Sequence, residues 1–315
     1  MAEPLLKTVT RTQGNNADLK SGAVAPQGFR FAFEEVPVLP QAFRRMVRDL
    51  EFDISEMALT TYLVAKAHGV AFTAVPAFLV RGFHHGAVQV LAGSDVRTPA
   101  DLAGRRVGVN RGYTVTTGVW ARAVLQDEYD VDLSGITWAL SGDEHVTQYE
   151  PPANVVPLEP GGTMEEQLRS GQLAAVIGAD LDSPDVVPLI PEPTEAGFRA
   201  LEQRGLYPIN HLVVVRNDLL RERPELAAEV FDVFARAKQR YVQRLRAEEI
   251  EAPTGTDRMY QRVLQATGSD PLPYGLEPNR AVLEQLLRAA VDQRILASPI
   301  AVEDVFAAGT TDLTA

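Results

Sequence analysis

The chain has 315 residues, of which 45% are hydrophobic and 23% charged, as in a soluble globular protein with one large or two smaller domains. A formal net charge of -12 argues against a nucleic-acid or anionic-membrane surface, because both require clustered lysine and arginine. The absence of cysteine excludes disulfides, thiolate metal sites and a cysteine nucleophile.

The N-terminal segment and the distribution of apolar residues indicate where the protein acts. Residues 1–14 contain no apolar core of about 7–15 residues and no small-residue cleavage site, so they do not resemble a signal peptide. No run reaches the roughly 18 apolar residues of a membrane span. We therefore expect a cytoplasmic protein with no membrane and no nucleic-acid partner.

The first fifty residues alternate between strand and helix patterns. Leu5–Thr10 reads as a strand, followed by a short helix that ends near Lys20. Phe29–Val36 alternates apolar and polar residues like a half-buried strand, and Leu39–Leu50 carries apolar residues at helical spacing. This order predicts βαβ units with a parallel sheet and covering helices.

The segment from Glu51 to Leu91 carries most of the polar residues expected to do chemistry. A short strand at Phe52–Ile54 is predicted to lead into a helix, with Ser55 as its N-cap and Glu56 in its first turn. Strand-like runs follow at Phe72–Val75 and Ala87–Leu91. Between them lie an arginine and two histidines, which need polar partners or an aqueous cleft: Arg81, His84 and His85.

A possible anion seat follows the next strand. Arg105–Asn110 reads as a short buried strand, and a helix is predicted from Thr114 to about Tyr129. Threonines, among them Thr116, crowd the start of this helix, where exposed backbone N–H groups and the helix dipole favour an anion. On the residues alone, it is equally plausible that the threonines only cap the helix.

The second half continues the α/β pattern. Asp180 follows a small-residue strand at its carboxyl end, where ligands gather in open α/β sheets. Glu192–Arg204 reads only as a mixed polar segment, and His211 directly precedes a buried strand. The other predicted strands are Ile136–Leu140, Leu173–Ile177 and Leu212–Val215, and the other helices are Met164–Ser170, Pro224–Arg244, about Asp257–Gln265 and Asn279–Leu296, with Asn279 as an N-cap.

Several segments together resemble the 4,5-dihydroxyphthalate decarboxylase family. They run in the family's order from about residue 50 to about residue 280: FDISEMAL, VPAFLVRGFHHGAV, DLAGRRVGVNRGYTVTTGVWARAVLQDEY, EHVTQYEPP, GLYPINHLVVVR and DPLPYGLEPN. The resemblance implies an α/β protein with the two-lobed type 2 periplasmic-binding-protein-like fold and a ligand cleft between the lobes. It also implies a discontinuous first domain, 1–92 with 212–315, and an inserted second domain, 93–211.

The resemblance further implies a cofactor-independent decarboxylase, a carbon–carbon lyase, acting on a small anionic aromatic acid such as a hydroxylated benzoate or phthalate. The residues expected to catalyse are His211, His85 and Glu56. The residues expected to bind substrate are Arg81, Tyr113, Thr114, Thr116, Ser55 and Asp180. Arg81 would hold a carboxylate, although an internal salt bridge from Arg81 to Asp53 or Glu56 is also possible. No metal is expected, and a homo-oligomer is one option for the assembly.

The chain departs from the family pattern at two positions. The family often has arginine where this chain has His84, and serine where it has Gly86. Loss of a permanent cation weakens the expectation of a dicarboxylate substrate. Two alternatives stay open: a binding protein that captures a small carboxylate without turnover, and a metal-dependent lyase that uses His84, His85 and Glu56.

Overall fold

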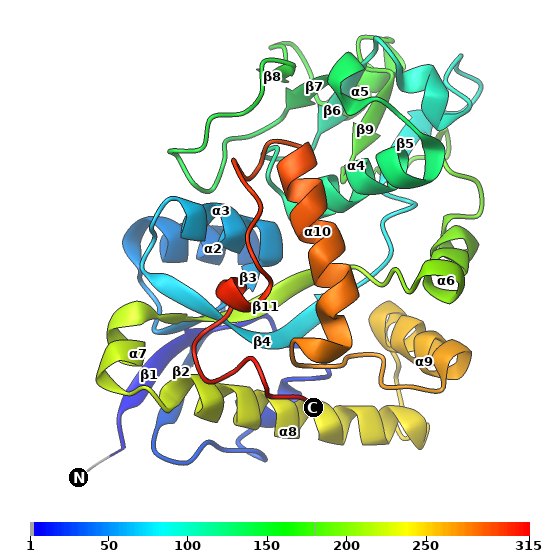
Figure 1. Ribbon diagram of the computed structural model, residues 1–315. Coiled ribbons are helices and arrows are strands. Elements are labelled where there is room, and N and C mark those ends of the chain that lie inside the picture. Colours follow the sequence, from blue (N-terminus) through cyan, green and yellow to red (C-terminus); the bar gives the residue numbers. More distant parts are fainter. Residues whose placement is uncertain (1–2, 180) are drawn as a thin grey trace. The chain divides into compact units, whose positions relative to one another are not determined.

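A computed structural model describes residues 3–179 and 181–315 of the chain (Figure 1). The chain folds into two compact units. The first unit comprises Met1–Gly82, Ile209–Glu284 and Ile300–Ala315, and the second comprises Phe83–Pro208 and Gln285–Pro299. The first crossing thus falls after residue 82 rather than after the predicted residue 92, because the strand at 88–91 pairs with strands of the second unit.

The first unit is built on a five-stranded sheet in the order β2-β1-β3-β11-β4. β1 (Leu5–Val9) pairs in parallel with β2 (Arg30–Glu34) and β3 (Ile54–Ala58). β11 (Ile209–Arg216) runs antiparallel between β3 and β4 (Phe72–Arg81). The carboxyl ends of β3 and β4 therefore meet the start of β11 at one edge of the sheet, where His211 pairs with Ala58 and Ile209 with Arg81.

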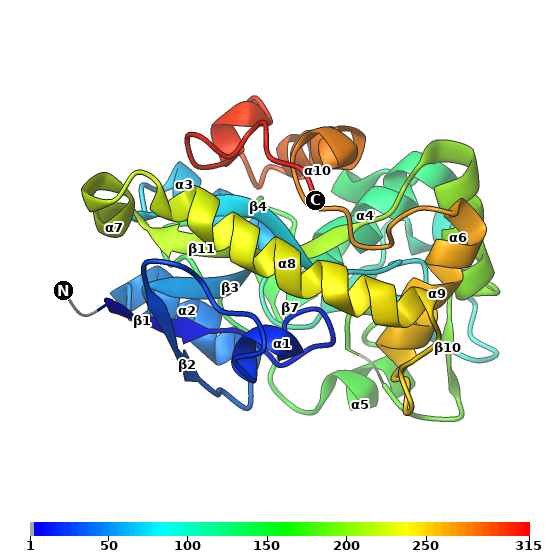
Figure 2. The ribbon, with the colours of Figure 1, turned by 90° about the horizontal axis from the view of Figure 1, so that it is seen from below.

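Helices cover both faces of this first sheet. α2 (Leu39–Asp49) and α3 (Leu59–Ala67) lie on one face, and the long helix α8 (Leu226–Arg246) crosses the other (Figures 1 and 2). Phe234 of α8 packs edge-on against Phe31 of β2, with ring centroids 6.0 Å apart. Other helical segments that begin in this unit are α1 (Ala17–Lys20), α7 (Asn217–Glu222), α9 (Gly255–Thr267), η3 (Glu277–Asn279) and α10 (Arg280–Asp292).

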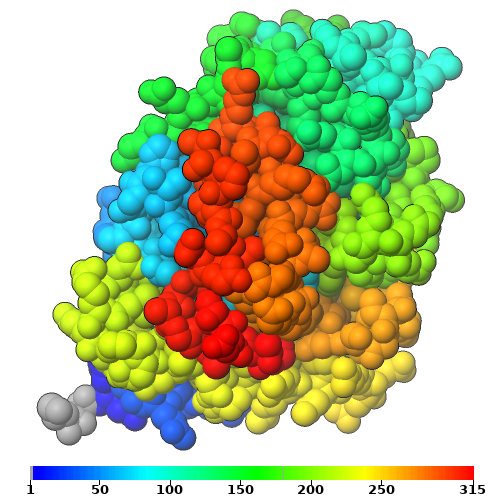
Figure 3. Space-filling view, in the orientation of Figure 1, coloured from blue at the N-terminus to red at the C-terminus, as the bar shows by residue number. Residues whose placement is uncertain are grey.

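The C-terminal segment returns to the edge strand of the first sheet. After η4 (Glu303–Val305), Phe306 forms a parallel bridge with Ala74 of β4, and the Ala307 N–H donates to the Ala74 carbonyl at 2.8 Å. In the space-filling view this segment, coloured red, lies on the surface (Figure 3). It gives the outer edge of β4 hydrogen-bond partners that would otherwise have to come from solvent.

The second unit is built on a six-stranded sheet in the order β10-β5-β9-β6-β7-β8. β9, β6, β7 and β8 run parallel, whereas β5 is antiparallel to both β9 and β10. Their bounds are β5 Val88–Leu91, β6 Arg106–Val109, β7 Thr137–Leu140, β8 Val155–Pro157, β9 Ala175–Ile177 and β10 Val186–Pro188.

Helices of the second unit bury its apolar residues. Leu168 of α5 (Met164–Arg169) packs with Ala139 and Val176 of the sheet, and Val124 of α4 (Thr116–Tyr129) packs with Ala196 of α6 (Pro193–Arg204). Trp120 and Trp138 are fully buried in this unit. The short segments η1 (Pro99–Leu102) and η2 (Leu133–Gly135) complete the unit.

The structure corrects the prediction that a helix starts at Ser55. Ser55 and Glu56 lie inside β3, both with 0% exposure, and α3 begins only at Leu59. A serine followed by a glutamate is a local signal for a helix start, but β3 is paired on both sides, with β1 and β11. Tertiary pairing therefore overrides the capping preference.

Other elements also differ from the predictions. The strand that holds His211 begins at Ile209, so the histidine lies within β11 rather than before it. The helix predicted from Thr114 begins at Thr116. The mixed polar segment at residues 192–204 forms α6, whose buried residues are Ala196, Gly197, Phe198 and Ala200. Because only this one face is apolar, the polar composition concealed the helix.

Of the helices within the described ranges, none combines the length and the apolar character that a membrane span requires.

The loop after β1 lies tightly against α8. A Cβ atom added at Gly14 would lie 2.2 Å from Cε2 of Tyr241, which real contacts do not allow. The Tyr241 hydroxyl donates to Asp257 Oδ1 at 2.5 Å, so the ring cannot move away freely. The loop therefore depends on a residue without a side chain at position 14.

We predict that Gly14→Ala lowers the free energy of unfolding by about 1–3 kcal/mol, the usual cost of overpacking. Urea unfolding followed by circular dichroism measures this. Gly255→Ala is the matched control, because a Cβ at the start of α9 meets nothing within 4 Å and alanine favours helix. Equal stability of the two variants would show that the loop can shift away from Tyr241.

Candidate functional site

Glu56 and His211 form a carboxylate–imidazole pair in the first unit. Glu56 pairs with Val213 across the β3–β11 ladder and His211 pairs with Ala58, so the two side chains are diagonal neighbours on one face. Nδ1 of His211 lies 2.7 Å from Oε1 of Glu56. Glu56 is fully buried, whereas the His211 side chain keeps 18% of its surface exposed.

Further donors hold the Glu56 carboxylate in place. The backbone N–H of Arg11 donates to Oε2 at 2.8 Å, and the Gln13 side-chain amide lies 3.5 Å from Oε1. Because the carboxylate oxygens accept from these N–H groups, we assign Nδ1 of His211 as the donor in its contact with Oε1. The Phe43 ring meets the imidazole edge-on at 5.3 Å between centroids. Nε2 is therefore the ring atom left to exchange a proton with a ligand.

Ser55 and Asp180 were both predicted to bind substrate. The Ser55 hydroxyl is fully buried and donates to the carbonyl of Glu56 at 2.7 Å. This bond stabilises the strand that carries Glu56. Asp180 lies outside the described residues. Binding of substrate by either residue stays a prediction.

Arg81 lies at the carboxyl end of β4 and is anchored by the Pro-rich loop before α10. Its Nη1 donates to Oδ1 of Asn279 at 2.8 Å, and Asn279 in turn donates to the carbonyls of Pro273 and Gly275. The side-chain oxygen of Asn279, which was predicted to cap α10, thus accepts a hydrogen bond from Arg81. Of the acids considered as salt-bridge partners for Arg81, Asp53 pairs with Arg216 and Glu56 with His211.

Tyr260 of α9 lies beside these charged groups. Its hydroxyl accepts the backbone N–H of Arg81 at 3.3 Å. Burial raises the pKa of Tyr260 to about 12, against the opposing charges of Arg81 and Arg11. The phenol therefore stays protonated at neutral pH. A role of Arg81 in holding a substrate carboxylate stays a prediction.

His85, the second predicted proton donor, belongs to the second unit and is paired there. It has 0% exposure, and its Nε2 lies 3.0 and 3.2 Å from the two carboxylate oxygens of Glu128. Its Nδ1 has no hydrogen-bond partner within residues 3–179 and 181–315. Arg204 also donates to Glu128. These contacts fit a structural pair, and the catalytic role of His85 stays a prediction.

The same contacts set the ionisation of Glu128. Burial raises the pKa of the Glu128 carboxyl, but the hydrogen bond from His85 and the charges of His85 and Arg204 together outweigh it, and the pKa lies below its ordinary value. Glu128 is therefore ionised at neutral pH. The pair joins the loop after β4 to α4, which stabilises the second unit.

The residues proposed as a metal site are divided between the units. His84 and His85 belong to the second unit and Glu56 to the first. Among the described residues, no group of three or more His, Asp or Glu side chains is arranged to hold a metal ion. At Gly86, a Cβ would lie 3.3 Å from Cβ of Pro193, so the serine common in the family pattern would crowd α6.

The predicted anion seat before α4 holds a carboxylate that belongs to the chain itself. The backbone N–H groups of Tyr113 and Thr114 point to the side chain of Glu144, and the Thr114 hydroxyl donates to its Oε2 at 2.5 Å. A Cβ at Gly112 would lie 2.6 Å from this same oxygen. The loop therefore has the chemistry of an anion site, and Glu144 fills it in this structure.

Arg122 packs against Tyr113 and stabilises the loop that forms this site. Its guanidinium is fully buried, lies 3.8 Å from the centroid of the Tyr113 ring and donates to the Tyr113 carbonyl at 2.6 Å. Burial lowers the pKa of Arg122, and the charge of Glu144 is among those that oppose this. Thr116, at the first position of α4, is 2% exposed. Binding of substrate by Tyr113, Thr114 and Thr116 stays a prediction.

Sequence reasoning missed Glu128 and Glu144. Their partners lie 43 and 31 residues away along the chain, and neither glutamate stands in a recognisable pattern. It also missed Arg11 and Gln13, for which a signal existed. Both follow the first strand at its carboxyl end, where ligands gather in α/β sheets.

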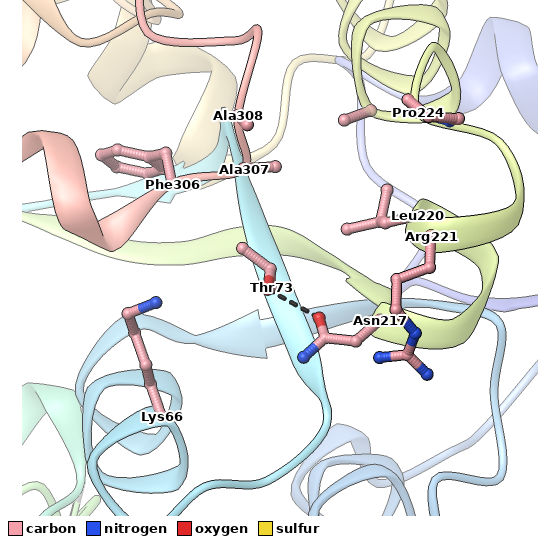
Figure 4. A pocket seen from close by; sticks show the side chains of 10 residues that line it. Lys66, Thr73, Asn217, Leu220, Arg221, Pro224, Phe306, Ala307 and Ala308 are labelled. Carbon is pink, nitrogen blue, oxygen red and sulfur yellow. Dashed lines mark hydrogen bonds between the residues drawn. The ribbon is translucent and has the colours of Figure 1, made fainter.

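Two cavities of the first unit lie at different places on its sheet. One, of about 460 Å³, is shown in Figure 4, where Thr73 donates to Asn217. Thr73 pairs with Val215, far along the strands from His211, so this cavity is remote from the Glu56–His211 pair. The other, of about 490 Å³, is bounded by the loop after β1 and includes Arg11 and Gln13, which hold Glu56.

Comparison with known proteins identifies relatives. The 4,5-dihydroxyphthalate decarboxylase of Comamonas testosteroni is 32% identical over 264 residues, which cover 78% of this chain and 79% of that protein. The 4,5-dihydroxyphthalate decarboxylase of Pseudomonas putida is 34% identical over 146 residues, 44% of this chain and 56% of that protein. No family model matches the chain.

Solved structures share the fold at low sequence identity. The alkanesulfonate-binding protein SsuA from Xanthomonas axonopodis pv. citri, bound to MOPS, has a TM-score of 0.53 and 16% identity, over 97% of this chain and 99% of that chain. A Candida albicans protein described as having the generic periplasmic binding protein fold has a TM-score of 0.54 and 13% identity. The match covers 95% of this chain and 93% of that chain.

These likenesses and the two mixed α/β sheets place the chain in the periplasmic-binding-protein-like fold class, as the sequence predicted. Within that class, the chain belongs to the 4,5-dihydroxyphthalate decarboxylase family. Decarboxylases are carbon–carbon lyases, so this is a family of enzymes.

We predict that Glu128→Gln lowers the free energy of unfolding by about 1–3 kcal/mol at neutral pH, because it removes the charged acceptor of buried His85. The pKa of Glu128 is lower in the folded chain than in the unfolded one, so its contribution is present above the unfolded pKa and disappears as pH falls through the folded pKa. Urea melts at several pH values measure this.

Glu202→Gln is the control for that series, since Glu202 is exposed on α6. It should change stability little at any pH. If the difference in free energy of unfolding between wild type and Glu128→Gln stayed constant into strong acid, the ionised carboxylate would not be the source of the stability.

We also predict that Glu144→Ala destabilises the protein by about 1–3 kcal/mol, because the donors of Tyr113 and Thr114 lose a charged acceptor. Acetate at millimolar concentration should restore part of the melting temperature by entering the emptied seat. Glu159→Ala, at an exposed position, serves as control. If acetate raised both melting temperatures equally, its effect would be nonspecific.

Proposed function

We propose that the protein decarboxylates a hydroxylated aromatic carboxylic acid of the 4,5-dihydroxyphthalate kind, with His211 as proton donor. Family membership supports the reaction class, since the relatives are named 4,5-dihydroxyphthalate decarboxylases. The observation that carries the assignment of His211 is its 2.7 Å contact with the buried Glu56 carboxylate.

In the proposed mechanism the substrate supplies the electrons. A ring hydroxyl ortho or para to the departing carboxylate pushes electron density onto the carbon that bears it. The imidazolium of His211 gives its Nε2 proton to this carbon, the carbon–carbon bond to the carboxylate breaks, and CO₂ leaves with the ring aromatic again. His211 then takes up one proton from solvent, so each turnover consumes one proton and releases one CO₂.

Glu56 has two tasks in this scheme. It fixes the orientation of the imidazole through Nδ1, so that Nε2 points to one place. Its negative charge also stabilises the imidazolium, and this effect is strong because Glu56 is fully buried. The reaction as proposed needs no cofactor, because the substrate hydroxyl and the protonated histidine together supply the electron push and the proton.

A second candidate function is capture of a small carboxylate without turnover. The likeness to the sulfonate-binding protein SsuA favours it, because that relative by fold is a binding protein. Both functions require an anionic ligand, and a cytoplasmic location, predicted from the sequence, is compatible with either. They differ in whether the ligand leaves unchanged.

The test is incubation of the purified protein with 4,5-dihydroxyphthalate, dihydroxybenzoates and phthalate, with CO₂ release and the organic product measured by mass spectrometry. We expect CO₂ from at least one hydroxylated acid and none from phthalate, which lacks the hydroxyl. Thermal stabilisation by these acids without any CO₂ would favour the binding protein instead.

We predict that His211→Ala lowers kcat by about 10²–10⁴-fold, the usual contribution of a general acid, and leaves the melting temperature near that of wild type. His68→Ala is the matched control, because His68 is an exposed histidine at the end of α3. Glu56→Gln should also lower kcat, since an amide cannot stabilise the imidazolium. Wild-type turnover in His211→Ala would transfer the proton donation to another residue.

A further inference from the structure

The cavity shown in Figure 4 lies at the end of the first sheet that is remote from the Glu56–His211 pair. It is lined by the last turn of α3, the start of β4, α7, the start of α8 and residues 306–308, all in the first unit. Its volume of about 460 Å³ is within the range of about 300–1,000 Å³ for small-ligand pockets. Along β4 it is roughly 25 Å from Arg81, at about 3.3 Å per residue. A ligand here would not touch the candidate reaction residues.

Two cations line this cavity. Lys66 is half-buried and Arg221 is exposed, and among the residues that the structure describes neither side chain has a hydrogen bond or an ion pair. None of the described lining residues is Asp or Glu. In a chain with a formal net charge of -12, this is a local excess of positive charge. The cavity therefore attracts an anion against the field of the whole protein.

Asn217 adds a fixed hydrogen-bond donor. Its backbone N–H donates to the Ala71 carbonyl at 3.0 Å, and its Oδ1 accepts from the Thr73 hydroxyl at 2.6 Å. Its Nδ2 has no acceptor within residues 3–179 and 181–315, so this amide group is available to a ligand. In Figure 4 the side chains of Lys66 and Arg221 flank the Thr73–Asn217 hydrogen bond on opposite sides. An ammonium, a guanidinium and an amide thus serve one cavity.

The rest of the cavity wall is apolar. Leu220, Pro224 and Phe306 contribute to it, and in Figure 4 they lie above the hydrogen bond that is drawn as a dashed line. The Phe306 ring is held in place by edge-on packing against Phe78, with centroids 6.0 Å apart. A bare inorganic ion would leave this wall in contact with water. A ligand with a small apolar body would cover it and gain the free energy of burial.

From these observations we infer that the cavity binds a phosphomonoester with a small apolar body. At neutral pH a phosphomonoester carries between about 1.5 and 2 negative charges and has three strong acceptor oxygens. Arg221 can donate two parallel bonds to it, and Lys66 and Asn217 can donate to the remaining oxygen. A carboxylate has one charge and two oxygens, fewer than these donors can serve. This binding site goes beyond the proposed function and does not depend on it.

The test compares three probes by isothermal titration at one pH and ionic strength: n-butyl phosphate, inorganic phosphate and pentanoate. We expect n-butyl phosphate to bind at least about tenfold more tightly than either of the others. Inorganic phosphate lacks the apolar body, and pentanoate lacks the second charge and the third oxygen. Equal affinity for inorganic phosphate would overturn the role of the apolar wall, and equal affinity for pentanoate would overturn the phosphate class.

Variants locate the site. Arg221→Gln and Lys66→Met should each weaken binding of n-butyl phosphate by about 10–100-fold, the range for a lost charged hydrogen bond. Both should keep the melting temperature of the ligand-free protein, because neither side chain loses a partner. Leu220→Ala should reduce the advantage of n-butyl phosphate over inorganic phosphate by about threefold or more, the effect of a lost methylene contact.

Arg246→Gln is the matched control, since Arg246 is an exposed cation of the same unit at the end of α8 and does not line the cavity. It should bind n-butyl phosphate as wild type does, and so should His211→Ala. Weakening in Arg246→Gln equal to that in Arg221→Gln would show only general attraction of an anion. Loss of binding in His211→Ala would move the ligand to the candidate reaction site. Either result, or no binding by wild type, overturns the inference.

Discussion

The buried carboxylate of Glu56 is the constraint on which the candidate site depends. A charge with no exposed surface is tolerated only when hydrogen bonds and opposite charge replace its water. The structure supplies these from the loop after β1, through Arg11 and Gln13, and from β11, through His211. Three segments that are distant in sequence are thereby required to meet. The same hydrogen bonds orient the His211 imidazole and hold the backbone of Arg11 in place.

The second unit uses internal carboxylates in a comparable way. Glu128 engages the buried His85, and Glu144 occupies the loop of Tyr113 and Thr114. In both contacts a glutamate of the chain occupies polar groups that could otherwise bind an anionic ligand: the His85 ring nitrogen, and the donors of Tyr113 and Thr114. In an acidic chain with 42 Asp and Glu against 30 Lys and Arg, many basic and N–H donors are taken up internally.

The fold of this protein does not determine which reaction it catalyses. The periplasmic-binding-protein-like fold also occurs in a sulfonate-binding protein, so the architecture alone selects no reaction. A decarboxylase differs from a receptor in needing a proton at a defined place. In the mechanism that we propose, the pairing of His211 with a fully buried glutamate meets that need, whereas binding an anion would require only donors and cations.

The sequence by itself determined the fold class, the family and most elements. Hydrophobic periodicity and glycine-rich turns are local, and the family's segments are contiguous. Tertiary structure decided the rest. Ser55 and Glu56 became strand residues because β1 and β11 pair with β3, and α6 formed because its few apolar residues share one face. The partners of Glu56, Glu128 and Glu144 lie 155, 43 and 31 residues away, and contacts at such separations arise only when the chain has folded.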